Sequence, residues 1–144
     1  SPSGRLPVTF YKQENNLPEL TDYSMEGRTY RYLKEEPLYP FGFGLGFGNV
    51  KYNNAEIISR LEDNVKLKVS ITNESEYDTT EKVQVYAKFT DSRTKTPNYQ
   101  LCGVKAVEIR KNETTETQIE IDRYWLKAVL KNGERVTPDG KGMQ

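Results

Sequence analysis

The segment from Pro37 to Gly48, which we call the aromatic-glycine segment, constrains the fold of this chain more than any other. It reads PLYPFGFGLGFG and sets aromatic residues among glycines and prolines without a helical or strand period. Glycine allows positive φ and close backbone approach, and proline removes a backbone donor, so this composition favours neither a helix nor a regular strand. We therefore expect an irregular segment of defined conformation whose aromatic rings pack against another surface.

Length and charge limit the possible classes of protein. A chain of 144 residues fits one domain, and its 21 basic and 21 acidic side chains cancel. This balance argues against nucleic acid or an anionic membrane as a partner. The sequence has no apolar run of about 18 residues and no basic-then-apolar leader, so we expect neither a membrane span nor a secretory signal. Its first residues, SPSG, look like the interior of a longer protein.

The absence of histidine limits the chemistry that this chain can perform. Histidine is the usual group for proton transfer near neutral pH and for transition-metal binding, so Ser-His-Asp catalysis, Cys-His catalysis and His-containing zinc sites are excluded. No metal and no other cofactor is expected. Carboxylates, tyrosine and lysine remain as acid or base groups, but the sequence singles out no pair of them. The lone Cys102 has a strand-like context and is interpreted as a buried, unreactive thiol.

Alternating apolar and polar residues after Asn49 predict strands with one buried face. The inward positions are Val65, Leu67, Val69 and Ile71, then Val83, Val85, Ala87 and Phe89, and finally Thr117, Ile119 and Ile121. A further extended region covers 101–109, where the apolar phase slips and predicts a bulge near Ala106 or Val107. Because no apolar helical pattern persists, we expect two antiparallel sheets packed as an all-β sandwich, with a small barrel as the alternative.

Turn residues and large aromatics add local predictions. Asn132-Gly133 lies between extended runs at 124–130 and 134–136 and favours a primed two-residue hairpin turn. Since aliphatic burial alone would be marginal, Tyr52 and Trp125 are expected to join the core. Asn73 and Asn112 begin glycosylation patterns, which we interpret as unmodified residues of surface turns.

The region before Asn49 reads as a connecting segment. Residues 4–11 form a short extended piece without an evident strand partner, and residues 12–22 are polar and typical of a linker laid over a surface. Residues 23–33 hold several tyrosines, more than a solvated tether needs, and are expected to dock on a neighbouring domain.

Four motifs give the chain a family resemblance. They are Gly4-Arg-Leu-Pro-Val-Thr-Phe-Tyr11, Tyr23-Ser-Met-Glu-Gly-Arg-Thr-Tyr-Arg-Tyr-Leu33, Pro37-Leu-Tyr-Pro-Phe-Gly-Phe-Gly-Leu45 and Val83-Gln-Val-Tyr86. Read in this order, they resemble the C-terminal part of a glycoside hydrolase family 3 β-glucosidase or β-xylosidase. The chain departs from the family pattern at Leu45-Gly-Phe-Gly48, and its turn at Thr72-Asn-Glu-Ser75 lacks the usual glycine.

The resemblance implies a fold and a division of the chain. Residues 1–45 would be the end of a preceding α/β sandwich domain and an extended N-terminal linker, and residues 46–144 would be a fibronectin type III-like, that is immunoglobulin-like, antiparallel β-sandwich. The parent enzyme would remove terminal β-linked glucose or xylose with retention, through two carboxylates. Neither catalytic motif of the family occurs here, so the segment itself has no expected catalytic residue, and its partners would be the catalytic domains of the same polypeptide and the parent's oligo- or disaccharide substrate.

Docking residues are assigned to the linker on the same basis. They are Tyr23, Arg28, Tyr30, Arg31, Tyr32, Tyr39, Phe41 and Phe43. A noncatalytic structural module is therefore the predicted function. The alternative is a carbohydrate-binding or adhesive sandwich, in which an exposed aromatic face stacks on a sugar ring.

Overall fold

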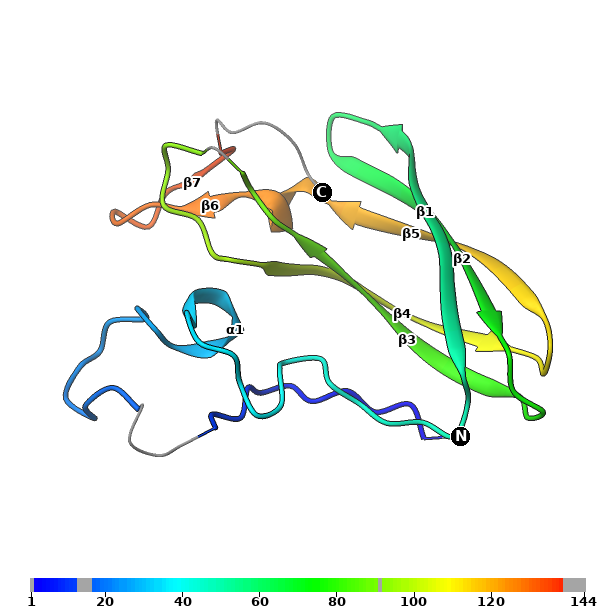
Figure 1. The fold of residues 1–144 in the computed structure, drawn as a ribbon. Coiled ribbons are helices and arrows are strands. Elements are labelled where there is room, and N and C mark those ends of the chain that lie inside the picture. The colour runs from blue at the N-terminus through cyan, green and yellow to red at the C-terminus, as the bar shows by residue number, and fades with distance from the viewer. Residues whose placement is uncertain (1, 13–16, 91, 139–144) are drawn as a thin grey trace. The chain divides into compact units, whose positions relative to one another are not determined.

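A computed structural model describes residues 2–12, 17–90 and 92–138 of the chain. The chain divides into two compact units, and each is described by itself. The first unit comprises Leu45–Tyr86, Leu101–Lys127 and the residues before Arg5, whereas the second comprises Arg5–Gly44, Ala87–Gln100 and the residues from Ala128 onward. The elements in chain order are α1 (Thr29–Tyr32), β1 (Val50–Arg60), β2 (Asn64–Asn73), β3 (Thr79–Ala87), β4 (Gln100–Ile109), β5 (Thr114–Asp122), the 3-10 helix η2 (Arg123–Leu126), β6 (Ala128–Val129) and β7 (Arg135–Val136) (Figure 1).

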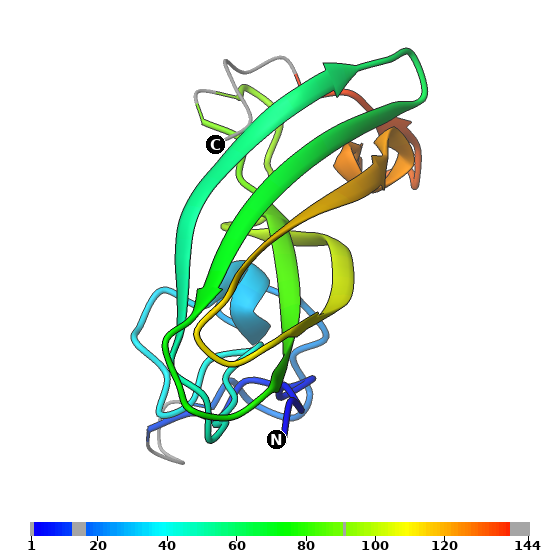
Figure 2. The ribbon, with the colours of Figure 1, turned by 90° about the vertical axis from the view of Figure 1, so that its right-hand side faces the viewer.

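The first unit is built from two sheets. One has the order β1-β2-β5 with antiparallel pairs, and the other pairs β3 with β4 (Figures 1 and 2). A methyl group added to Gly103 of β4 would lie 3.4 Å from Ile121 and 3.5 Å from Ile119 of β5. Strand β4 therefore packs against the inner face of the three-stranded sheet, and the predicted all-β sandwich is confirmed.

The inner face of the three-stranded sheet follows the predicted alternation. On β2 the exposed fractions of Val65, Val69 and Ile71 are 1%, 4% and 0%, and Ile119 and Ile121 of β5 are equally buried. Their lysine, glutamate and threonine neighbours point the other way, because successive strand side chains alternate between faces. Strand β5 pairs with β2 without a register shift from Asn64↔Asp122 to Thr72↔Thr114.

Strand β4 changes its buried face partway along. Cys102 and Val107 are both buried although five positions separate them, and the residues from Val104 to Ala106 are exposed. The predicted slip of the apolar phase is therefore present between Cys102 and Val107. The Cys102 thiol is buried as expected and donates to the Val85 carbonyl oxygen over 3.3 Å.

Two aromatics expected in the core are half-exposed instead. Tyr52 and Trp125 each retain 50% of their surface. Tyr52 lies on the edge strand β1, and its hydroxyl donates to the Glu81 carboxylate over 2.9 Å. Trp125 belongs to η2 rather than to the expected extended run, and Leu126 is the residue that η2 buries.

The hairpin near Asn132 has a longer turn than predicted. Leu130 accepts from Gly133 over 2.9 Å and donates to the Glu134 carbonyl over 2.8 Å, which leaves residues 131–133 as the loop between β6 and β7. Gly133 has φ 83, whereas Asn132 is not among the residues of positive φ, so a primed two-residue turn is wrong. The observed arrangement is the three-residue loop with glycine in the left-handed region.

In the second unit, the N-terminal extended piece has a partner that the sequence did not reveal. Leu6 donates to the Phe43 carbonyl oxygen and accepts from Gly42, both over 2.8 Å. Phe10 forms an antiparallel bridge with Tyr39. The aromatic-glycine segment is thus irregular, as predicted, and residues 4–11 run antiparallel beside it.

Candidate docking surface

All eight predicted docking residues belong to the second unit, and four of them form two ring contacts. Tyr30 of α1 stacks on Phe41 with ring centroids 4.3 Å apart and an interplanar angle of 19°. Tyr39 contacts Phe43 with centroids 5.0 Å apart and meets Phe10 edge-on at 6.2 Å. The structure therefore joins α1, the aromatic-glycine segment and the first extended piece through aromatic packing.

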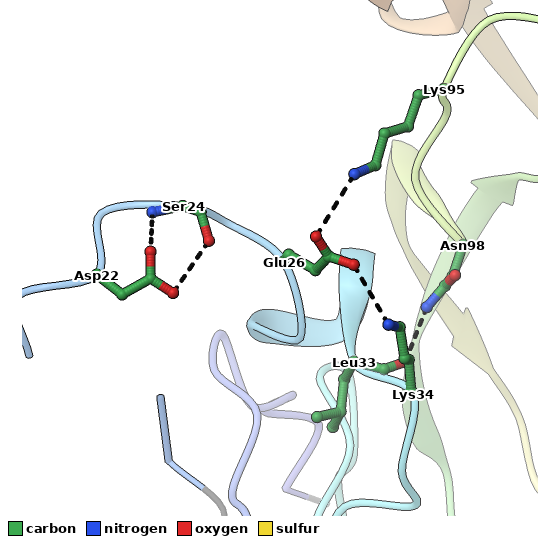
Figure 3. A network of polar contacts seen from close by, with 7 residues as sticks. All are labelled: Asp22, Ser24, Glu26, Leu33, Lys34, Lys95 and Asn98. Carbon is green, nitrogen blue, oxygen red and sulfur yellow. Dashed lines mark hydrogen bonds and ion pairs between the residues drawn. The ribbon is translucent and has the colours of Figure 1, made fainter. Parts of the chain in front are cut away.

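The Arg28 side chain forms hydrogen bonds with the backbone of the loop that precedes it. One guanidinium nitrogen donates to the carbonyl oxygens of Glu19 and Asp22, over 2.9 and 2.6 Å. The Ser24 amide and hydroxyl donate to the Asp22 carboxylate and, with the charge of Arg28, hold the pKa of that carboxyl below its usual value (Figure 3). The loop from Glu19 to Ser24 is thereby closed around one arginine.

The start of α1 is held in a strained conformation. Thr29 has φ 54, which is rare for a β-branched residue and costs about 1–3 kcal/mol. Its amide donates to the Tyr11 hydroxyl over 3.2 Å. The contacts around α1 therefore outweigh the preference of this backbone position.

Asn98 fixes the loop between β3 and β4 to the end of α1. Its amide nitrogen donates to the Arg31 carbonyl over 2.6 Å, and its side chain donates to the Leu33 carbonyl over 2.9 Å (Figure 3). This role could not be predicted from sequence, because a polar residue in a polar connection looks like any other loop residue. Only the satisfied carbonyls of the last turn of α1 reveal it.

Next to Asn98 lies an open groove of about 890 Å³, which Tyr32 helps to line. Glu26 lies at its wall with one carboxylate oxygen 3.3 Å from the Lys34 nitrogen and the other 4.0 Å from the Lys95 nitrogen (Figure 3). The sequence does not reveal this ion-pair cluster, because Lys95 lies far from Glu26 and Lys34 in the chain.

The predicted docking side chains differ in exposure. Tyr23 is 94% exposed and Tyr39 is 43% exposed, whereas Arg31 is half-buried and contributes its carbonyl to Asn98. Leu20, at 95%, adds an exposed apolar side chain close to Tyr23 in sequence. Tyr23 is thus the predicted docking residue most available to a partner.

An exposed aromatic pair in the first unit bears on sugar binding. Tyr124 and Trp125 of η2 are 44% and 50% exposed, with ring centroids 5.2 Å apart and an interplanar angle of 86°. Perpendicular rings present two faces in different directions. They do not form the flat aromatic platform on which successive sugar rings stack.

The described residues hold neither a candidate metal cluster nor a candidate membrane-spanning helix. Residues 2–12, 17–90 and 92–138 bring together no group of three His, Cys, Asp or Glu side chains suited to a metal ion. Within the same ranges, no helix is long and apolar enough to cross a membrane.

Comparison with known proteins gives one consistent picture. Residues 81–142 match the fibronectin type III-like domain family. A xylan 1,4-β-xylosidase of Xylanibacter ruminicola is 30% identical over 88% of this chain, and a periplasmic β-glucosidase of Salmonella typhimurium is 26% identical over 88%. The chain spans only 14% and 19% of the lengths of these two relatives.

Solved structures agree in fold. The GH3 β-glucosidase of Bifidobacterium adolescentis superposes on 94% of this chain with a TM-score of 0.80 at 23% identity. β-Glucosidase 3B of Thermotoga neapolitana superposes on 92% with a TM-score of 0.78 at 27% identity. The chain covers 22% and 21% of those two structures, so the similarity concerns one part of much larger molecules.

Proposed function

Because this chain corresponds to the C-terminal region of glycoside hydrolase family 3 β-glucosidases and β-xylosidases, we propose that it is a noncatalytic structural module of such an exo-acting enzyme. The observation that carries the proposal is the small share of each relative's length that this chain spans. Nearly the whole chain aligns with one part of the relatives, and that part is less than a quarter of each relative described above. Most of the length in which a catalytic site could reside therefore has no counterpart in this chain.

The proposal assigns the two parts of the chain different tasks. Residues 1–45 would connect to, and dock on, the catalytic domains of the same polypeptide, and residues 46–144 would be the fibronectin type III-like domain. Tyr23, at 94% exposure, is the side chain best placed to contact a partner, while Tyr30 and Phe41 stabilise the linker by packing on each other. An exposed aromatic side chain is a common anchor in protein interfaces.

The proposed parent removes terminal β-linked glucose or xylose from an oligo- or disaccharide. A retaining mechanism uses one carboxylate as nucleophile and a second as acid and base, and both would lie in the other domains. The structural module would position these domains and would not touch the scissile bond.

Two measurements test the proposal. The 144-residue chain is incubated with nitrophenyl β-glucoside and β-xyloside, and we expect no hydrolysis above the buffer rate. In the full-length gene product, Tyr23→Ser is expected to make the boundary between the module and the catalytic domains more sensitive to limited proteolysis. Tyr77→Ser is the matched control, since Tyr77 is 70% exposed but lies in the turn between β2 and β3. Turnover by the chain alone, or equal proteolysis of both variants, would contradict the proposal.

The alternative function is sugar binding by the sandwich, for which Tyr124 and Trp125 offer two half-exposed but perpendicular rings. Isothermal titration with neutral xylo- and cello-oligosaccharides separates the two. Saturable binding that Trp125→Ala abolishes would support this second candidate, whereas the structural module predicts no heat of binding.

A further inference from the structure

The groove beside Asn98 carries a concentration of positive charge that the whole chain does not have. The chain is neutral, with 21 basic and 21 acidic side chains. Among the described residues, the lining of the groove includes the cationic side chains Lys34, Arg93, Lys95 and Lys131 and the carboxylate of Glu26. A concave surface lined mainly by one sign of charge attracts the opposite sign.

The Glu26 carboxylate faces two of these lysines at once. Glu26 is shared between Lys34 and Lys95, at 3.3 and 4.0 Å, and all three side chains are more than 60% exposed. One negative charge facing two lysines cannot neutralise both. The two lysine side chains stay largely exposed beside this carboxylate (Figure 3).

The remaining lining groups suit a polyhydroxylated ligand. Tyr32 supplies an aromatic ring, Thr94 and Thr96 supply hydroxyls, and Asn98 supplies an amide whose nitrogen is fixed on the Leu33 carbonyl. Hydroxyls and amides exchange hydrogen bonds with sugar hydroxyls, and an aromatic face complements the apolar face of a sugar ring. The volume of about 890 Å³ lies within the range of small-ligand sites.

We propose that this groove binds a carboxylate-bearing oligosaccharide, with the carboxylate of a uronic acid residue on the lysines and the neutral sugar residues beside Tyr32. The choice of a saccharide rests on the proposed function, whereas the choice of a carboxylate rests on the charge of the groove alone. An acidic peptide would satisfy the lysines equally well. It would make less use of the clustered hydroxyl and amide groups.

The test is a titration of the 144-residue chain, followed by amide NMR shifts, with xylotriose carrying one glucuronic acid and with neutral xylotetraose. We expect saturable shifts at Lys95 and Asn98 with the acidic sugar only. Raising the salt from 20 to 500 mM should weaken the binding roughly tenfold, since screened surface charges lose most of their attraction. Lys95→Ala should weaken it roughly threefold or more, and Glu26→Gln, which removes the competing carboxylate, should strengthen it roughly twofold. Lys51→Ala is the control, because Lys51 is exposed on β1.

Three results would overturn the proposal. One is the absence of shifts with the acidic sugar. Another is equal binding of the neutral sugar, and the third is binding of a hexaglutamate peptide with no response to the saccharide. None of these depends on hydrolysis or on proteolysis of the full-length enzyme, so failure here is distinct from failure of the proposed function.

Discussion

Tyr30 and Phe41 stack nearly face to face, with ring centroids 4.3 Å apart and planes 19° apart. Tyr30 lies in α1 and Phe41 in the aromatic-glycine segment, so this contact ties two parts of the second unit together. Two motifs that carry the family resemblance thus meet through these rings, and the contact should be measurable as a coupling energy.

A double-mutant cycle with Tyr30→Leu and Phe41→Leu is expected to give a coupling energy of about 0.5–1.5 kcal/mol, because an aromatic pair contributes that much beyond its buried area. Urea unfolding of the wild type, both single variants and the double variant measures it. Tyr23→Leu combined with Phe41→Leu is the control pair, since Tyr23 is 94% exposed. Additive single effects in the first cycle would show that the rings contribute separately.

Asn73 should be one of the most sensitive polar positions in the first unit. It is fully buried, and its amide donates to the carbonyl oxygens of Tyr77, Ile109 and Arg110 over 2.7, 3.2 and 3.2 Å. Asn73→Ala would leave these carbonyls without that donor, and we expect a loss of about 2–4 kcal/mol in the free energy of unfolding. Asn54→Ala on the exposed face of β1 should change it by less than about 0.5 kcal/mol.

The same burial has a consequence for modification. The expectation of a surface turn was wrong for Asn73, whereas Asn112 is exposed. When the folded protein is incubated with an enzyme that glycosylates asparagine, Asn73 should therefore not be modified. Mass spectrometry that finds a glycan there would show that the buried geometry is incorrect.

Gly48 tests the close packing at the end of the aromatic-glycine run. A Cβ at this position would lie 3.0, 3.1 and 3.2 Å from the Oγ1, Cβ and Cγ2 atoms of Thr79. Gly48→Ala is therefore expected to destabilise the first unit by about 1–3 kcal/mol, the usual cost of overpacking. Gly4→Ala is the matched control, because nothing lies within 4 Å of its added methyl group. Equal unfolding midpoints for the two variants would contradict this account.

How far the fold follows from sequence is illustrated by the three strands of one sheet. Strands β2 and β5 were predictable, because one face is buried and the other solvated, which forces alternation. Strand β1 was not, since the residues from Lys51 to Glu56 are all exposed and carry no alternating pattern. Its structure comes from the ladder with β2, which runs from Val50↔Asn73 to Arg60↔Val65 and includes two register shifts.

The contacts of the candidate docking surface were likewise only partly predictable from the sequence. Clustered tyrosines and glycines indicated that residues 23–45 pack on something, but not that Tyr30 would meet Phe41 within the chain. The contacts of Asn98 and Glu26 depend on a loop some 65 residues from α1, and no local pattern encodes such a meeting. Likewise, Asn132-Gly133 marked the hairpin, although the pairing of the flanking strands set its loop to three residues.

Lys68 provides a test by pH. It lies on the central strand β2, with its ammonium 2.8 Å from the Glu56 carboxylate on β1 and 3.9 Å from that of Glu116 on β5. The hydrogen bond with Glu56 and the charges of Glu116 and Glu56 raise the pKa of Lys68 above its usual value of 10.5. A lysine whose pKa is higher in the folded state than in the unfolded state contributes its full stabilisation at pH values below the unfolded-state pKa. That contribution is lost as the pH rises through the folded-state pKa.

The free-energy difference between the wild type and Lys68→Met should therefore be constant from about pH 7 to 9 and shrink above pH 10.5, where the lysine deprotonates in the unfolded state before it does so in the folded state. Urea unfolding of both proteins between about pH 7 and 12 measures this difference, and titrations of other groups cancel because both proteins share them. Lys51→Met on β1 is the control, for which no ion pair is found among the described residues. A difference for Lys68→Met that stays constant, or grows, above pH 10.5 would show that the two glutamates do not hold the charged lysine in the folded state.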